Sequence, residues 1–132
     1  MIGFDTNLLV RHFTHDDPAQ VVVVTAVFDK TRRRGETIYV SLVVLCELHW
    51  VLTTIYGLER LDVIDTVRAL LDDPLFSVEH PSETEAALAS YIALGGDFPD
   101  HLIGSLAESA GAVTTYTFDK KAAKLPGFTL LK

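Results

Sequence analysis

The 132-residue sequence contains very little cysteine, since Cys46 is its single thiol. One cysteine cannot form a disulfide within the chain, and this indicates a reducing compartment, so we expect a cytoplasmic protein. The sequence also lacks any apolar run of the roughly 18 residues that a bilayer crossing requires. Its first residues carry no basic segment and reach an acid at Asp5, so we expect neither a secretory signal nor a membrane partner.

Positive charge is scarce as well. Lys and Arg number 11 against 18 Asp and Glu, and the formal net charge is −7. Affinity for nucleic acids normally comes from Lys and Arg, so any nucleic-acid function must explain how a negatively charged chain binds phosphate. Hydrophobic residues make up 48% of the chain, which is enough for a buried core and excludes wholesale disorder. With no internal repeat or linker, the length predicts one domain over residues 1–132.

Several well-known catalytic motifs are missing. The sequence has no GxGxxG, no P-loop and no GxSxG, so dinucleotide binding, P-loop chemistry and serine hydrolysis have no support. Cys46 and the five histidines lack the spacing of a zinc site, and a buried structural thiol is the better interpretation of Cys46.

Short β-branched and aromatic segments alternate with longer helical segments along the chain. We expect strands at residues 1–4, 37–40, 75–78, 112–118 and 128–131, and helices that begin near residues 8, 18, 42, 58, 81 and 99. Each connection between strands is long enough for a crossover, which favours parallel pairing. The pattern predicts an α/β fold with a mainly parallel central sheet of four to five strands flanked by helices.

Four acids occupy positions where such a fold binds ligands, beyond the carboxyl ends of its strands. Asp5 follows the first strand and Asp119 the fourth, and Asp100 begins the helix that precedes the fourth strand. Glu47 lies on the helix after the second strand, beside an apolar column, where an unpaired charge is costly. We therefore expect these carboxylates to meet around a hard divalent cation such as Mg²⁺ or Mn²⁺.

Taken singly, each of these aspartates is better explained as the cap of a helix or turn. Three acids at strand–helix junctions, together with an acid on an apolar helix face, favour a site. Asp97 is balanced between capping a helix and supporting the metal ligands, while Asn7 and Thr117 suit local caps or residues that orient carboxylates. For His101 a surface position is favoured over contact with substrate.

Five segments resemble a known family. Residues 4–11 (FDTNLLVR) resemble the opening of PIN-domain ribonucleases, and four further segments resemble the VapC toxin branch of that superfamily. These are residues 16–20 (DDPAQ), 41–52 (SLVVLCELHWVL), 96–103 (GDFPDHLI) and 117–127 (TFDKKAAKLPG). Each motif alone is weak, but their order and spacing over nearly the whole chain are specific.

The resemblance implies a PIN-like three-layer sandwich and a Mg²⁺- or Mn²⁺-dependent endoribonuclease. It also implies a homodimer and a toxin that a cognate antitoxin protein holds inactive. The family's catalytic, metal-binding acids fall on Asp5, Glu47, Asp100 and Asp119. His101 departs from the family, because many relatives carry a small residue after the third acid.

Two other functions remain open at this stage. One is a non-catalytic PIN-like module that binds RNA or a protein, which the acidic balance favours slightly. The other is phosphoryl transfer with Asp5 as the nucleophile, although the sequence lacks a closely paired second acid beside it. The apolar segments 42–55 and 58–71 either offer a surface to a partner helix or belong to the core.

Overall fold

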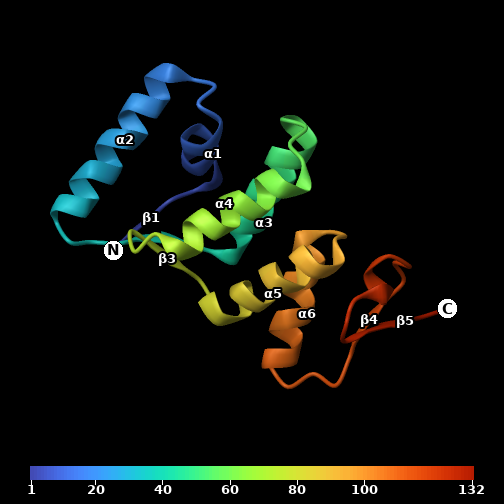
Figure 1. Ribbon diagram of the computed structural model, residues 1–132. Coiled ribbons are helices and arrows are strands. Elements are labelled where there is room, and N and C mark those ends of the chain that lie inside the picture. The colour runs from blue at the N-terminus through green and yellow to red at the C-terminus, as the bar shows by residue number, and fades with distance from the viewer. The chain divides into compact units, whose positions relative to one another are not determined.

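Five short strands, all paired in parallel, organise the chain (Figure 1). The computed structural model describes residues 1–132, which divide into two units, Met1–Glu79 and His80–Lys132. The three-stranded sheet, in the order β1-β2-β3, belongs to the first unit, and the two-stranded sheet of β4 and β5 belongs to the second.

The first unit alternates strands with helices. Its elements are β1 (Ile2–Gly3), α1 (Thr6–Thr14), α2 (Pro18–Arg33), β2 (Ile38–Val40), α3 (Leu42–Trp50), α4 (Arg60–Asp72) and β3 (Phe76–Val78). Helix α1 packs against both α2 and α3. Fully buried aliphatic side chains such as Leu9, Ile38, Leu45 and Leu70 form its core.

Helix starts in this unit follow the local chemistry of the sequence. Ser41 accepts a hydrogen bond from the backbone N–H of Val44 and so caps α3, and Asp17 caps α2 in the same way through Gln20. Pro18 occupies the first position of α2, where its missing N–H costs nothing. These caps fix where the helices begin after each strand or turn.

The helix expected over residues 42–55 changes its form near its end. It is α-helical as far as Trp50 and continues as a π-helix over Val51–Ile55. Val51, Thr53, Thr54 and Ile55 are β-branched, and such residues have low helix propensity. The wider turn ends where the backbone N–H of Tyr56 donates to the carbonyl of Val51.

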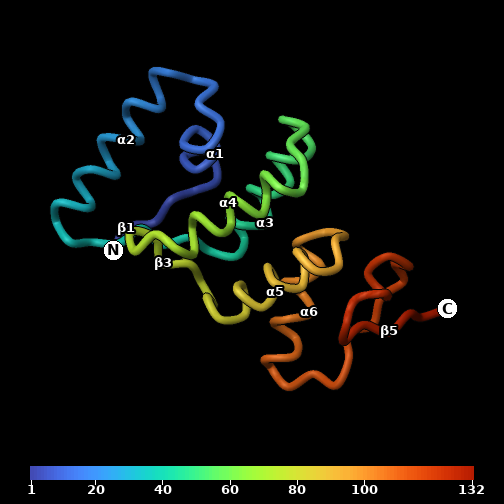
Figure 2. The backbone as a smooth tube through the Cα atoms, viewed as in Figure 1, coloured from blue at the N-terminus to red at the C-terminus, as the bar shows by residue number.

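The second unit is a helix pair with a small sheet. It contains α5 (Pro81–Leu94), α6 (Phe98–Ser109), β4 (Thr115–Thr117), a 3₁₀ turn (Ala122–Lys124) and β5 (Phe128–Leu130). Figure 2 shows the backbone of α5 turning directly into α6, and the two helices pack against each other. Gly104 of α6 lets β5 come close, because a Cβ there would lie 2.8 Å from Cε2 of Phe128.

The α/β class and the parallel pairing agree with the expectation from the sequence. The strands form two sheets, where one central sheet of four to five strands was expected. The expected strand at 112–118 shortens to Thr115–Thr117, since Val113 is fully exposed and has nothing to pack against. None of the helices combines the length and the hydrophobicity that a membrane crossing requires.

Candidate active site

Two of the predicted acids lie in the first unit, at neighbouring places. Asp5 occupies the N-cap position of α1, directly after the buried Phe4, yet its side chain makes no capping hydrogen bond. Glu47 lies on α3, and its Oε2 accepts a hydrogen bond from Oγ1 of Thr6 at 3.1 Å. Because Thr6 follows Asp5 in the chain, this bond holds Glu47 in the region of Asp5.

Glu47 is exposed, which corrects the expectation that it lies against buried apolar residues. The neighbouring Val43 and Trp50 are 68% and 57% exposed, and α3 faces the core with Leu45 and Leu48 instead. The sequence of α3 is apolar on nearly every side, so its periodicity could not identify the buried face. Desolvation therefore does not call for a cation at Glu47, and the hydrogen bond from Thr6 is what holds this carboxylate.

The second unit gathers the other two predicted acids, together with Asp97, around one hollow. Asp97, Asp100 and Asp119 line a cavity of about 260 Å³, together with Gly96, Lys121, Ala122 and Leu125. Asp97 stands at the N-cap of α6 and Asp100 in its first turn, and Asp119 follows β4. The sheet and the helix pair thus place all three residues on the wall of one cavity, together with Lys121.

These acids differ in whether the side chain caps a helix or a turn. Asp97 makes no side-chain capping bond although it occupies a cap position. Asp119 does cap, because its Oδ1 accepts from the backbone N–H groups of Lys121 and Ala122 at 2.8 and 3.4 Å. Thr117 Oγ1 accepts from the backbone N–H of Asp119, so it holds this turn and bonds no carboxylate. Oδ1 of Asp119 is therefore engaged by the turn, whereas Oδ2 is available to another partner.

His101 is buried, which is the second correction to the sequence analysis. Its side chain is 4% exposed, and both ring nitrogens have partners. Nδ1 lies 2.8 Å from Oγ of Ser90 and Nε2 lies 2.6 Å from the carbonyl oxygen of Gly95. The expectation of a surface position failed because the polar partners come from α5 and its end, 6 and 11 residues earlier in the chain.

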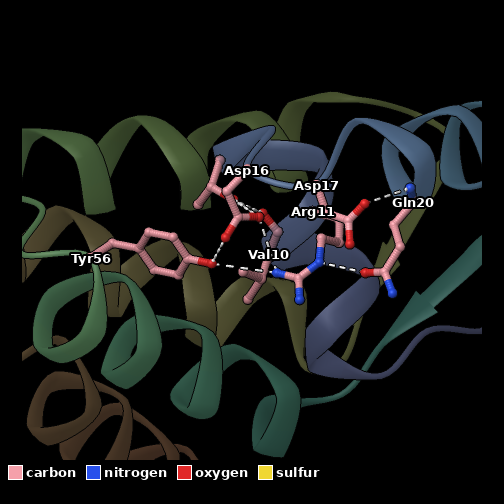
Figure 3. A network of polar contacts seen from close by, with 7 residues as sticks. Val10, Arg11, Asp16, Asp17, Gln20 and Tyr56 are labelled. Carbon is pink, nitrogen blue, oxygen red and sulfur yellow. Dashed lines mark hydrogen bonds and ion pairs between the residues drawn. The ribbon is translucent and has the colours of Figure 1, made fainter.

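Asn7 is exposed on α1 and lines a mainly apolar hollow with Leu8, Arg11, Gln20, Val23 and Val24. Arg11 belongs to a polar network that Figure 3 shows. Its Nη1 bonds Asp16 Oδ1 at 3.1 Å, and the hydroxyl of Tyr56 donates to the same carboxylate. The Tyr56 hydrogen bond lowers the pKa of Asp16 below its usual value. This network fixes the end of α1 that lies opposite Asp5.

The acids fit a hard cation by the chemistry of their donors. All are carboxylates, with no thiol or imidazole among the side chains that line the acidic cavity, and oxygen donors suit Mg²⁺ and Mn²⁺. Neither unit by itself holds three or more His, Cys, Asp or Glu side chains close enough together to hold a metal ion. Mg²⁺ keeps several waters and needs only one or two carboxylates, so the set of donors remains suitable.

Thr6 is a site residue that was not predicted from the sequence, and its hydroxyl is the one side-chain partner of Glu47 in the first unit. No sequence signal marks it, because Thr6 and Glu47 are 41 residues apart and a threonine in the first turn of a helix is common.

Comparisons with known proteins identify the family of the chain. A family model of the PIN domain matches residues 2–127, which include all four predicted acids. The chain is also similar to a VapC ribonuclease of Aquifex aeolicus (strain VF5), with 29% identity over 121 residues that cover 92% of this chain and 89% of the relative. Since the family model covers nearly the whole sequence, the chain belongs to the PIN domain family.

Proposed function

We propose that this chain is a Mg²⁺- or Mn²⁺-dependent endoribonuclease and the toxin of a toxin–antitoxin pair. The observation that carries the proposal is the cavity lined by Asp97, Asp100 and Asp119 in a chain of the PIN domain family. The similarity to a VapC ribonuclease supports the class of substrate. Clustered carboxylates serve no purpose in binding an anionic polymer unless a cation lies between them and the phosphate.

In this proposal the four acids of the family pattern are the catalytic and metal-binding residues. Asp5 and Asp100 are the most direct ligands, and Glu47 and Asp119 contribute directly or through water. The chemistry supplied by the bound ion is activation of a water for in-line attack and neutralisation of charge on the phosphate. Asp119 contributes Oδ2, because Oδ1 is engaged by the turn. Lys121 adds a positive charge at the cavity wall, which offsets part of the repulsion between this acidic chain and RNA.

Cleavage of RNA tests the proposal. We expect purified protein to cleave RNA with Mg²⁺ or Mn²⁺, and Asp5→Asn and Asp100→Asn each to lower the rate by more than about 100-fold, beyond the usual loss at outer positions. Asn preserves the shape and the helix-capping ability of Asp, so the change isolates the charge. Asp65→Asn, an exposed acid of α4, is the charge-matched control and keeps the wild-type rate. Unchanged cleavage in both site variants overturns the assignment.

The second candidate is a PIN-like module that binds RNA or protein without cutting. The net charge and the lack of a three-ligand cluster within either unit favour it. Calorimetry with Mn²⁺ separates the two candidates, since the nuclease requires binding that Asp100→Asn weakens. The absence of any Mn²⁺ binding favours the binding module over the nuclease.

The antitoxin and a second copy of the chain are the proposed protein partners. Four large apolar side chains of the segments 42–55 and 58–71 are more than half exposed, which supports a partner surface over a wholly buried role. They are Val43, Trp50, Ile55 and Leu61. We expect the product of a neighbouring small open reading frame to co-purify with the chain and to inhibit cleavage. A chain that remains alone and freely active contradicts this part of the proposal.

A further inference from the structure

His101 follows Asp100 in the chain, and its ring lies beside Gly96, which lines the acidic cavity. Its ring is buried, packs edge-on against Tyr91 with ring centroids 5.7 Å apart, and has a hydrogen-bonding partner at each nitrogen. A buried imidazole requires such partners, and their identity shows what the ring holds together. One partner is a side chain of α5, and the other is the backbone carbonyl of Gly95.

The two partners define how the ring is held. The carbonyl oxygen of Gly95 can only accept a hydrogen bond, so Nε2 carries a proton and donates it. Nδ1 and the hydroxyl of Ser90 on α5 form the second hydrogen bond of the ring. Every polar atom of the ring is satisfied in this arrangement, and no buried side-chain nitrogen or oxygen of the structure lacks a partner.

Gly95 and Gly96 form the turn that this ring holds. Both have positive φ values, 71° and 80°, which residues with a side chain rarely adopt, so the turn depends on contacts that keep it in place. Gly96 itself lines the acidic cavity, and the position of a Cβ on Gly96 lies 4.0 Å from Nε2 of His101. The next residue is Asp97, whose carbonyl accepts from the backbone N–H groups of Asp100 and His101.

We propose that His101 is a positioning residue of the acidic site, which ties the Gly95–Gly96 turn to the start of α6 and so fixes Asp97 and Asp100 for binding of the ion. The chain of contacts runs from Ser90 through the ring to Gly95, and from Gly95 along the backbone to both carboxylates. The inference rests on the proposed function for the identity of the ion. It explains why an imidazole follows Asp100, where the family resemblance leads us to expect a small residue.

A matched control exists on the same helix pair. Ser105 of α6 donates to the carbonyl of Glu83 on α5 at 2.8 Å, so it also joins the two helices, but at a distance from the glycine turn. Ser105→Ala removes one bond between the helices, as a change at His101 does, without touching the turn. A purely structural role predicts the same consequences for both changes.

The experiment measures Mn²⁺ affinity by calorimetry and amide hydrogen exchange of residues 95–97 in the full chain. We expect His101→Phe to weaken Mn²⁺ binding by about 10-fold, the lower range for residues that orient metal ligands, and to accelerate exchange at the turn. His101→Gln offers an amide donor to Gly95 and restores most of the affinity. Ser105→Ala lowers thermal stability while leaving the affinity unchanged.

The outcomes separate this inference from the proposed function. Wild-type protein that binds no Mn²⁺ overturns both. Wild-type binding together with unchanged affinity and exchange in His101→Phe overturns the positioning role alone, and so does an equal loss in Ser105→Ala. If His101→Phe does not fold, Ser90→Ala decides, because it keeps the ring and removes its Nδ1 partner; affinity and exchange equal to the wild type overturn the role there too.

Discussion

The two units hold their acids in different ways. In the first unit Asp5 and Glu47 are exposed, and one hydrogen bond from Thr6 links the segments that carry them. In the second unit Asp97, Asp100 and Asp119 surround a cavity whose backbone is fixed from two sides, by the capped turn after Asp119 and by the ring of His101. The segments that carry the acids are thus held by more of these side-chain hydrogen bonds in the second unit than in the first.

Substitutions in the two cores provide the largest effect and test whether these halves fold together. Phe98 is fully buried and packs against Tyr91, and Leu70 is fully buried in the first unit. We expect Phe98→Ala to cost about 3–5 kcal/mol and Leu70→Ala about 2–5 kcal/mol in the free energy of unfolding. The prediction of one domain over residues 1–132 requires a single denaturant transition that both changes shift. Two transitions, each sensitive to one substitution, contradict it.

Asp119 is the second test, because it serves the turn and the proposed site at once. Asp119→Asn keeps an acceptor at Oδ1 for Lys121 and Ala122, so the fold is preserved while the charge is lost. Asp119→Ala also removes the cap, which costs about 1 kcal/mol more. We expect both variants to lose RNA cleavage to the same extent and only the alanine variant to lose stability in thermal unfolding. Wild-type cleavage by the asparagine variant reduces Asp119 to a capping residue.

Thr6 is the equivalent probe of the first unit, with a smaller effect. Thr6→Val keeps the shape of the side chain and removes the hydroxyl that donates to Glu47. We expect a loss in Mn²⁺ affinity of no more than about 10-fold, because Glu47 remains present but less fixed. Thr6→Ser retains the donor and serves as the control. A larger loss for Thr6→Val than for His101→Phe would reverse the comparison between the units.

The sequence predicted best what depends on local chemistry. Short stretches of characteristic residues predict where the elements begin or end. Examples are the helix caps at Ser41 and Asp17 and the break at Gly95-Gly96. The order of the PIN motifs gave the family, which the match to residues 2–127 shows. The assignment of the catalytic and metal-binding acids remains a prediction from the family pattern; these acids are Asp5, Glu47, Asp100 and Asp119.

What the sequence could not predict depends on contacts between distant residues. The buried face of α3 was hidden because Val43, Val44 and Leu45 are all apolar, and only packing decides which of them is covered. The burial of His101 depends on where Ser90 and the carbonyl of Gly95 lie in space. The division of five strands into two sheets likewise depends on pairing that strands of two or three residues do not encode.

The smallest effect concerns an acid outside the site. Asp73 follows α4 and accepts from Nη1 and Nη2 of Arg32 at 3.2 and 2.7 Å, and this bond lowers the pKa of Asp73. Its carboxylate is therefore already balanced by a cation, in contrast to a carboxylate kept for a metal ion. We expect Asp73→Asn to leave Mn²⁺ affinity unchanged and to cost less than about 1 kcal/mol at neutral pH, because the pair is partly exposed and screened.

The pH dependence of the stability lost in Asp73→Asn tests whether this loss comes from the charge of Asp73. A lowered pKa in the folded state stabilises the protein above the unfolded pKa, near 3.8, and this stabilisation is lost as the pH falls through the folded value. The difference in unfolding free energy between wild type and Asp73→Asn should therefore be present at pH 7 and shrink steadily below about pH 4. Denaturant titrations at a series of pH values measure it. A difference that persists at the lowest pH would mean that Asp73 acts through the hydrogen bond that its Oδ1 accepts from Leu75, and not through its charge.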